Sequence, residues 1–182
     1  KKINTTGLSC GGQDYQFDMI IYATGFDAVT GGFDRIDIRG LGGLRLKEKW
    51  QNGPRTYLGL QVESFPNMFT LVGPHNAASF CNIPRCIEQN VEWVANLLSY
   101  LKERNIKRIA PTLAAENEWT DHVNEVASKL LFTKVDSWFT GINKNIAGKD
   151  QRTSLLYAGG APSYKQRCDE VASNDYVGFM MQ

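Results

Sequence analysis

The chain has 182 residues, of which 42% are hydrophobic and 21% are charged. It can bury one sizeable core, but it is short for two complete nucleotide-binding domains. Its formal net charge of +1 creates no long-range field for a polyanion, and its lysines and arginines are spread along the chain. We therefore expect no nucleic-acid partner.

No stretch of the sequence predicts a membrane segment or a signal peptide. The longest apolar runs, residues 19–23 and 68–73, are far shorter than the roughly 20 residues that a membrane span requires. The first six residues contain no apolar core behind their positive charges. The four cysteines form no Cys-x-x-Cys pair. We therefore expect reduced thiols, a cytoplasmic location and no membrane partner.

The N-terminal part predicts strands. Residues 17–23 form a nearly continuous apolar run, typical of a strand buried on both faces, that leads into Thr24, Gly25 and Phe26. Residues 9–14 have the composition of a tight turn, so residues 1–22 are expected to form a hairpin. A glycine-rich loop region then reaches about residue 55, and residues 68–74 predict a second buried strand.

Two amphipathic helices are predicted in the second half. The first has Asn82 as its N-cap and Pro84 in its first turn. Its apolar residues recur at helical steps of three and four: Ile83, Ile87, Val91, Val94, Leu98 and Leu101. The second helix begins after Thr112, carries Trp119 and Val123 on one face, and should end near Phe132. Beyond residue 136 we expect loops with one short strand at residues 154–158.

Three local patterns point to other chemistry only weakly. The run Gly40-x-Gly42-Gly43 lacks the last glycine of a dinucleotide fingerprint, because Arg45 occupies that place. His75 and His122 have no cysteine or aspartate at ligand spacing, so no metal site is predicted. Ser79 does not lie in a Gly-x-Ser-x-Gly elbow, so the sequence does not indicate a hydrolase.

Several further features, taken in order, point to one family. Asp18, Ala23, Thr24, Gly25 and Phe26 describe either a core strand with a tight exit or the strand-end motif of flavoprotein monooxygenases and disulfide reductases. Residues 64–74, then 82–84 with 87–93, then 131–138 and 155–160 follow it, and the similarity continues from Tyr164 through Phe179. Over nearly its whole length the chain resembles the C-terminal portion of a type I Baeyer–Villiger monooxygenase, a flavoprotein like cyclohexanone and phenylacetone monooxygenase.

The resemblance implies an α/β fold: an incomplete FAD/NAD(P)-binding, Rossmann-like flavoprotein fold with C-terminal helices and a loop-rich tail. Residues 1–55 would be the end of the NADP-binding part and the linker to the FAD domain. Residues 56–182 would be the C-terminal part of the FAD-binding domain, with helices and a mobile loop. Such an enzyme uses NADPH, FAD and dioxygen to insert oxygen beside a ketone carbonyl, which gives an ester or lactone.

The chain lacks both Gly-x-Gly-x-x-Gly fingerprints, the signature motif of the family, and its catalytic Arg and Asp. The resemblance therefore implies that FAD and NADP both need a missing N-terminal part and that the chain alone is inactive. The alternative is a non-catalytic module, derived from such an enzyme, that associates with itself through the exposed former interface. Exposed apolar surface should mark that interface.

The resemblance also implies site residues, none of them catalytic. The positions matched to cofactor binding are Thr24, Gly25, Asn82, Ile83 and Trp138, and those matched to ketone binding are Ser79, Phe80 and Leu156. The free N–H groups of the helix that begins at Asn82 would face the flavin. Trp138 would cover NADP from a mobile loop, although a buried core tryptophan is the alternative. This loop departs from the family pattern, because it is two residues longer and has Ala147 in place of proline.

Overall fold

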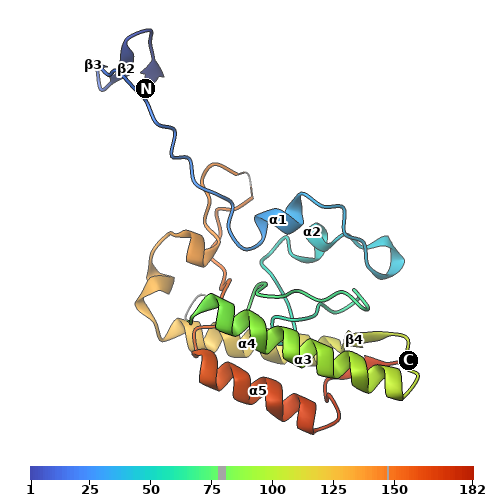
Figure 1. Cartoon of the computed structure of the whole chain (residues 1–182). Helices are drawn as coiled ribbons and strands as arrows, with labels where there is room; N and C mark the ends of the chain where they lie inside the picture. Colours follow the sequence, from blue (N-terminus) through green and yellow to red (C-terminus); the bar gives the residue numbers. More distant parts are fainter. Residues whose placement is uncertain (78–80, 147) are drawn as a thin grey trace.

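The computed structural model describes residues 1–77, 81–146 and 148–182. A small sheet at the N-terminus stands apart from a helical body, and an extended segment joins the two (Figure 1). In the sheet, β1 (Lys2–Ile3), β2 (Gly7–Cys10) and β3 (Gln13–Gln16) are antiparallel neighbours in chain order. A turn at Gly11 and Gly12 joins β2 to β3, which confirms the predicted hairpin over this part.

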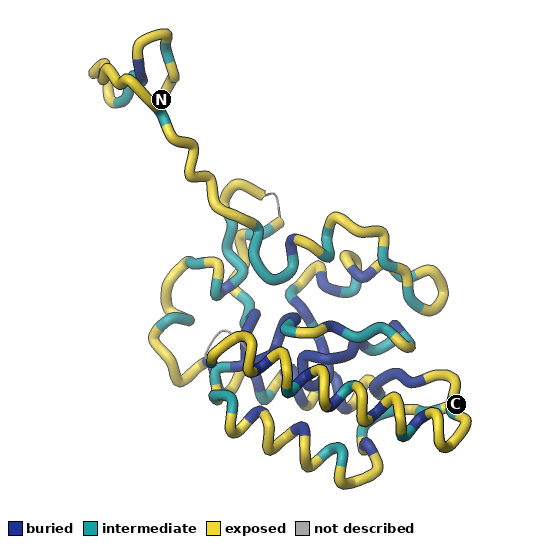
Figure 2. The backbone as a smooth tube through the Cα atoms, in the orientation of Figure 1, coloured by how far each residue is buried: buried dark blue, intermediate teal, exposed yellow. Residues whose placement is uncertain are grey.

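The predicted buried strand at residues 17–23 is wrong. Residues 17–23 belong to no strand, and Met19 and Ile21 are 75% and 79% exposed. Figure 2 shows this segment as an exposed tube between the small sheet and the body. A strand buried on both faces needs partner strands and covering helices, and no described segment supplies them. The apolar residues therefore lie at the surface.

The body contains five α-helices, three 3-10 helices and two strands in the described residues. In chain order these are α1 (Gly31–Asp34), η1 (Leu41–Gly43), α2 (Leu46–Lys49), α3 (Ile83–Glu103), β4 (Ile109–Pro111), α4 (Leu113–Ser128), η3 (Leu131–Lys134), η4 (Trp138–Thr140), α5 (Ala161–Ser173) and β5 (Phe179–Met181). β4 and β5 are antiparallel, with Ile109 opposite Met181. The chain thus has mixed helix and strand content. No described helix is long and apolar enough to cross a membrane.

Both long helices begin where their caps predict. The Asn82 side chain accepts a hydrogen bond from the Arg85 N–H at 3.3 Å, and the Thr112 side chain accepts one from the Ala115 N–H at 3.1 Å. Each bond satisfies one of the N–H groups that the first turn of a helix leaves open. α4 ends at Ser128, a few residues before the predicted end near residue 132, where η3 continues the chain.

The predicted apolar stripe of α3 faces mostly outward. Ile83, Val91 and Leu98 are each about half exposed, whereas the helix buries Cys86, Asn90, Trp93, Leu97 and Leu101 on its inner face. The inner face packs against α4 and α5 in a core that also includes Trp119, Val123 and Tyr164. A smaller cluster of Leu46, Trp50, Val62 and Phe65 lies under α2. α3 is therefore apolar on two sides, and only one side is covered.

The remaining two predicted strands are also absent. In residues 68–74, Val72 has a φ of 58°, a left-handed conformation that interrupts an extended strand. Residues 154–158 bend at Leu156 and make only two backbone hydrogen bonds, from the His75 N–H to Leu155 O at 2.8 Å and from the Tyr157 N–H to Asn76 O at 3.1 Å. This pairing is too short to form a regular strand, and it attaches the C-terminal segment to the loop before α3.

Gly59 permits the close packing of this loop. It has a φ of 65°, and a Cβ at this position would lie 2.8 Å from the backbone nitrogen of Asn76. Any other residue would have to push the chain at His75 and Asn76 away. Residues 59 and 72–77 therefore form a compact base directly before the start of α3.

Candidate functional site

Two of the segments predicted to contact the nucleotide meet at one cleft. Thr24 and Phe26 line a cavity of about 160 Å³ together with Trp138 and Asn143. A second cavity, of about 540 Å³, shares Thr24, Phe26 and Asn143 and is also lined by Gly25. The structure thus brings Thr24, Gly25 and Trp138 together, although more than 100 residues separate them in the sequence. The cleft presents an aromatic ring and an amide from its loop side.

Trp138 is a surface residue, so the alternative that it is a buried core tryptophan is wrong. Its side chain is 46% exposed and stacks on the Phe139 ring at a centroid distance of 3.9 Å. The backbone around it is fixed by hydrogen bonds from the Gly141 N–H to Trp138 O and from the Ile142 N–H to Ser137 O. The indole is therefore held at the surface on a hydrogen-bonded turn.

The start of α3 leaves the Ile83 N–H open among the described residues. Pro84 has no N–H, and the Arg85 N–H is capped by Asn82. The Ile83 N–H has no acceptor among the described residues, and both Asn82 and Ile83 are exposed. The positive end of the helix dipole and this N–H together favour a ligand that accepts a hydrogen bond and carries negative charge.

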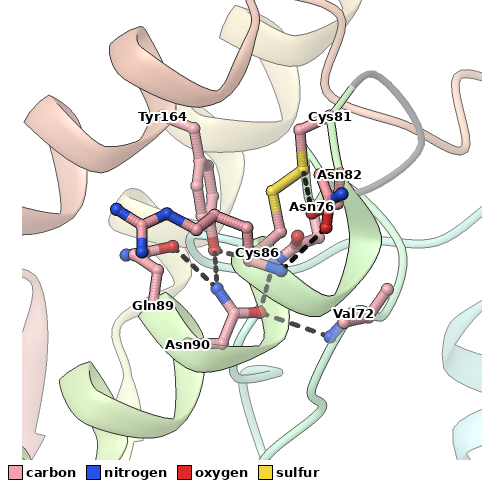
Figure 3. Close-up of a disulfide and its surroundings, with 9 residues drawn as sticks. Val72, Asn76, Cys81, Asn82, Cys86, Gln89, Asn90 and Tyr164 are labelled. Carbon is pink, nitrogen blue, oxygen red and sulfur yellow. Dashed lines mark hydrogen bonds between the residues drawn. A yellow bond between two sulfur atoms is a disulfide. The ribbon is translucent and has the colours of Figure 1, made fainter.

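A disulfide joins Cys81 to Cys86, so the prediction that all four cysteines are reduced is wrong (Figure 3). Cys10 and Cys168 are free thiols. Cys81 directly precedes the N-cap and Cys86 is the fourth residue of the helix. These are the two positions that a hydrophobic staple commonly brings together at a helix start. The two cysteines are five positions apart and meet because the first turn of the helix brings them together, so a search for Cys-x-x-Cys spacing does not find them.

Beneath the start of α3 lies a buried polar network, which the sequence did not indicate (Figure 3). The Asn76 side-chain amide donates to Asn90 Oδ1 at 2.7 Å and to the Tyr164 hydroxyl at 2.8 Å. Tyr164 donates to Leu58 O at 2.7 Å, and the Val72 N–H donates to Asn90 Oδ1 at 3.3 Å. All three side chains are at most 1% exposed. The network ties the loop before α3 to both α3 and α5.

His75 anchors the same loop from its other side. Its Nδ1 lies 3.1 Å from Thr56 Oγ1 and its Nε2 lies 3.0 Å from Ser154 O. Burial lowers the pKa of His75 to about 4, although the Ser154 carbonyl acts in the opposite direction, so the ring is neutral near pH 7. No group of three His, Cys, Asp or Glu side chains in the described ranges is placed to hold a metal ion.

The positions predicted to bind the ketone are only partly accounted for. Ser79 and Phe80 lie outside the described residues. Leu156 is 4% exposed, and its neighbour Leu155 lines the 160 Å³ cavity. Sequence reasoning missed Lys149, Asp27 and Asp34, which form a charged cluster beside this cavity. Asp27 directly follows Phe26, but its partner lies 122 residues away.

No family model matches the chain. Among curated proteins, it is 45% identical over 179 residues to the 2-oxo-Delta(3)-4,5,5-trimethylcyclopentenylacetyl-CoA monooxygenase of Pseudomonas putida, which covers 98% of this chain. It is 38% identical over 182 residues to the cyclohexanone 1,2-monooxygenase of an Acinetobacter species, which covers 100% of this chain. The chain spans 33% of the length of each of these relatives.

Solved structures agree with these relatives. A crystal structure of OTEMO in complex with FAD and NADP superposes over 100% of this chain with a TM-score of 0.89 at 44% identity. The closed crystal structure of cyclohexanone monooxygenase does so with a TM-score of 0.92 at 38% identity. The chain covers 33% and 34% of these two structures.

Proposed function

We infer that this chain, a homologue of one third of the FAD-dependent Baeyer–Villiger monooxygenases, forms one wall of the FAD site and one wall of the NADP site of such an enzyme. Its residues 1–55 would end the NADP-binding part and link it to the FAD domain, and residues 56–182 would close an incomplete Rossmann-like FAD-binding fold. The observation that carries the proposal is the match to such enzymes over 98–100% of the chain at 38–45% identity.

In this proposal the start of α3 supports the flavin. When bound, FAD would supply the redox chemistry and the activation of dioxygen, and the part of this chain is electrostatic. The open Ile83 N–H and the helix dipole would stabilise the negative charge that reduction places on the flavin. The Cys81–Cys86 disulfide and the Asn82 cap hold this donor in place. The Asn76–Asn90–Tyr164 network makes the base beneath it rigid.

The cleft between Thr24 and Trp138 would receive NADP. Thr24 and Gly25 contribute one side of the cleft, and Trp138 and Asn143 contribute the other. The exposed indole of Trp138 can donate a hydrogen bond through its N–H and can cover a flat ring with its face. Closure of the cleft over the nucleotide would exclude water from the reacting groups. A ketone would then be converted to an ester or lactone.

A chimera tests this proposal. The matching third of the Acinetobacter cyclohexanone monooxygenase, to which the chain is 38% identical, would be replaced by this chain. We expect the chimera to retain FAD and to oxidise NADPH in a manner that depends on cyclohexanone. A folded chimera that does not retain FAD would refute the proposal.

A matched pair of variants isolates the role of the helix start. Ile83→Pro removes the open N–H at a position where proline fits a helix, whereas Ile83→Ala shortens the side chain and keeps the donor. One hydrogen bond contributes about 1 kcal/mol. The affinity of the chimera for FAD should therefore fall about fivefold with Ile83→Pro and change little with Ile83→Ala. Equal effects of the two variants would show that the side chain, not the donor, is what matters.

The outward apolar face of α3 favours an interface. Ile83, Ile87, Val91 and Leu98 are between 38% and 51% exposed, and they form one side of a single helix. We propose that the part of the monooxygenase outside this chain packs here. The alternative function, a non-catalytic module that associates with itself, would cover the same face in the 182-residue chain. Sedimentation of the 182-residue chain, alone and mixed with the remaining part of the enzyme, distinguishes the two. A dimer that persists in the mixture would favour the self-associating module.

A further inference from the structure

Lys149 joins the loop that carries Trp138 to the segment that follows Phe26. Its Nζ lies 2.6 Å from Asp27 Oδ2, 2.9 Å from Asp34 Oδ2 and 3.0 Å from Thr30 Oγ1. An ammonium group has three donors, so this set of three acceptors is complete. The side chains of Lys149, Asp27 and Asp34 are 18%, 13% and 22% exposed. We call these four residues the Lys149 cluster.

Backbone hydrogen bonds connect Lys149 to the turn of Trp138. The Asn143 N–H donates to Lys149 O at 2.9 Å, and the Ile142 N–H donates to Ser137 O at 3.1 Å. The Thr153 N–H donates to Thr140 O at 3.0 Å and closes the loop at its base. A displacement of Lys149 would therefore be transmitted to the Asn143 and Trp138 sides of the cleft.

Close packing fixes the position of Asp27 in the Lys149 cluster. Asp27 packs so closely on Gly31 that a Cβ on the glycine would lie 2.5 Å from Asp27 Cβ. Two partly buried carboxylates then face one ammonium group, which leaves a net charge of −1 and makes the cluster depend on Lys149. Burial alone lowers the pKa of Lys149, but the hydrogen bonds and charges of Asp27 and Asp34 outweigh it and raise the pKa.

We propose that Lys149 is a positioning residue that holds the Trp138 loop against residues 27–34 and so sets the shape of the nucleotide cleft. The identity of the ligand in this cleft rests on the proposed function. The holding role itself does not, because it follows from the contacts of the chain alone. Without Lys149, Asp27 and Asp34 would repel each other and the loop would lose its attachment.

Amide hydrogen exchange on the 182-residue chain tests the holding role. Lys149→Met should accelerate exchange at Ile142 and Asn143 by about tenfold or more, because local opening no longer breaks the ion pairs. Lys149→Arg keeps the charge and should preserve most of the protection. Lys144→Met is the matched control, since Lys144 lies on the same loop but is 78% exposed in its pair with Asp136. Amides of α3 and α4 should be unaffected in all three variants.

Exchange at Ile142 and Asn143 within twofold of wild type in Lys149→Met would overturn the proposal. So would a uniform acceleration that includes α3 and α4, because it would indicate general destabilisation. In the chimera described above, Lys149→Met should weaken NADP⁺ binding about tenfold with its FAD content unchanged. Failure of the unmutated chimera to bind NADP⁺ would count against the proposed function and leave the exchange result standing.

Discussion

Removal of a single hydroxyl from Tyr164 should measurably destabilise the chain. Tyr164 is 1% exposed, donates to Leu58 O at 2.7 Å and accepts from Asn76 Nδ2 at 2.8 Å. Tyr164→Phe preserves the ring but removes the hydroxyl, so Leu58 O and Asn76 Nδ2 each lose a hydrogen-bond partner. Each buried group that loses a partner costs about 1–3 kcal/mol, so with two such groups we expect the free energy of unfolding to fall by about 2–6 kcal/mol.

The measurement is urea unfolding followed by tryptophan fluorescence, with a thermal scan alongside it. For a chain of this length, about 2–4 °C of Tm is lost per kcal/mol, so Tm should fall by about 4–24 °C. Tyr176→Phe is the control, because Tyr176 is 6% exposed and its hydroxyl has no hydrogen-bond partner in the described part of the chain. If the two variants differ by less than about 0.5 kcal/mol, the network does not stabilise the loop before α3.

Three other predictions follow from the charges and the cleft. Because the pKa of buried His75 is about 4 when folded and 6.5 otherwise, the unfolded chain binds more protons between these values. Stability should therefore decline from pH 6.5 towards pH 4, and urea midpoints of His75→Gln should show a weaker decline. Lys49→Met should cost about 3–5 kcal/mol by urea unfolding, because it leaves the carboxylate of Glu116, which is 0% exposed, without the cation 2.9 Å away. In the chimera, Trp138→Phe should raise the hydrogen peroxide released per NADPH with Tm almost unchanged, whereas a lower Tm with normal coupling would remove Trp138 from the site.

The similarity to known monooxygenases and the two long helices could be predicted from the sequence. The resemblance to Baeyer–Villiger monooxygenases is confirmed by the relatives, and the solved OTEMO structure contains FAD and NADP. The starts of α3 and α4 depend on local capping by Asn82 and Thr112, which sequence patterns register well. The assignment of individual residues to the cofactors stays a prediction.

Features that depend on distant partners could not be predicted. The apolar run at residues 17–23 has the pattern of a buried strand, but a strand also needs neighbours, and Met19 is 75% exposed. Lys149 is one of 20 basic residues, and nothing in its local pattern points to Asp27. The Asn76–Asn90–Tyr164 network joins residues up to 88 positions apart. Spacing along the chain carries no information about such contacts.

The outlying N-terminal sheet also governs how the molecule moves through solvent. A compact chain of 182 residues has a radius of gyration of about 16 Å. Residues 17–26 extend between the sheet and the body, and ten extended residues reach roughly 35 Å. Mass at that distance contributes to the radius of gyration by its square, and it also adds drag. The chain should therefore sediment and tumble like an elongated particle, with unequal rotational diffusion about its long and short axes.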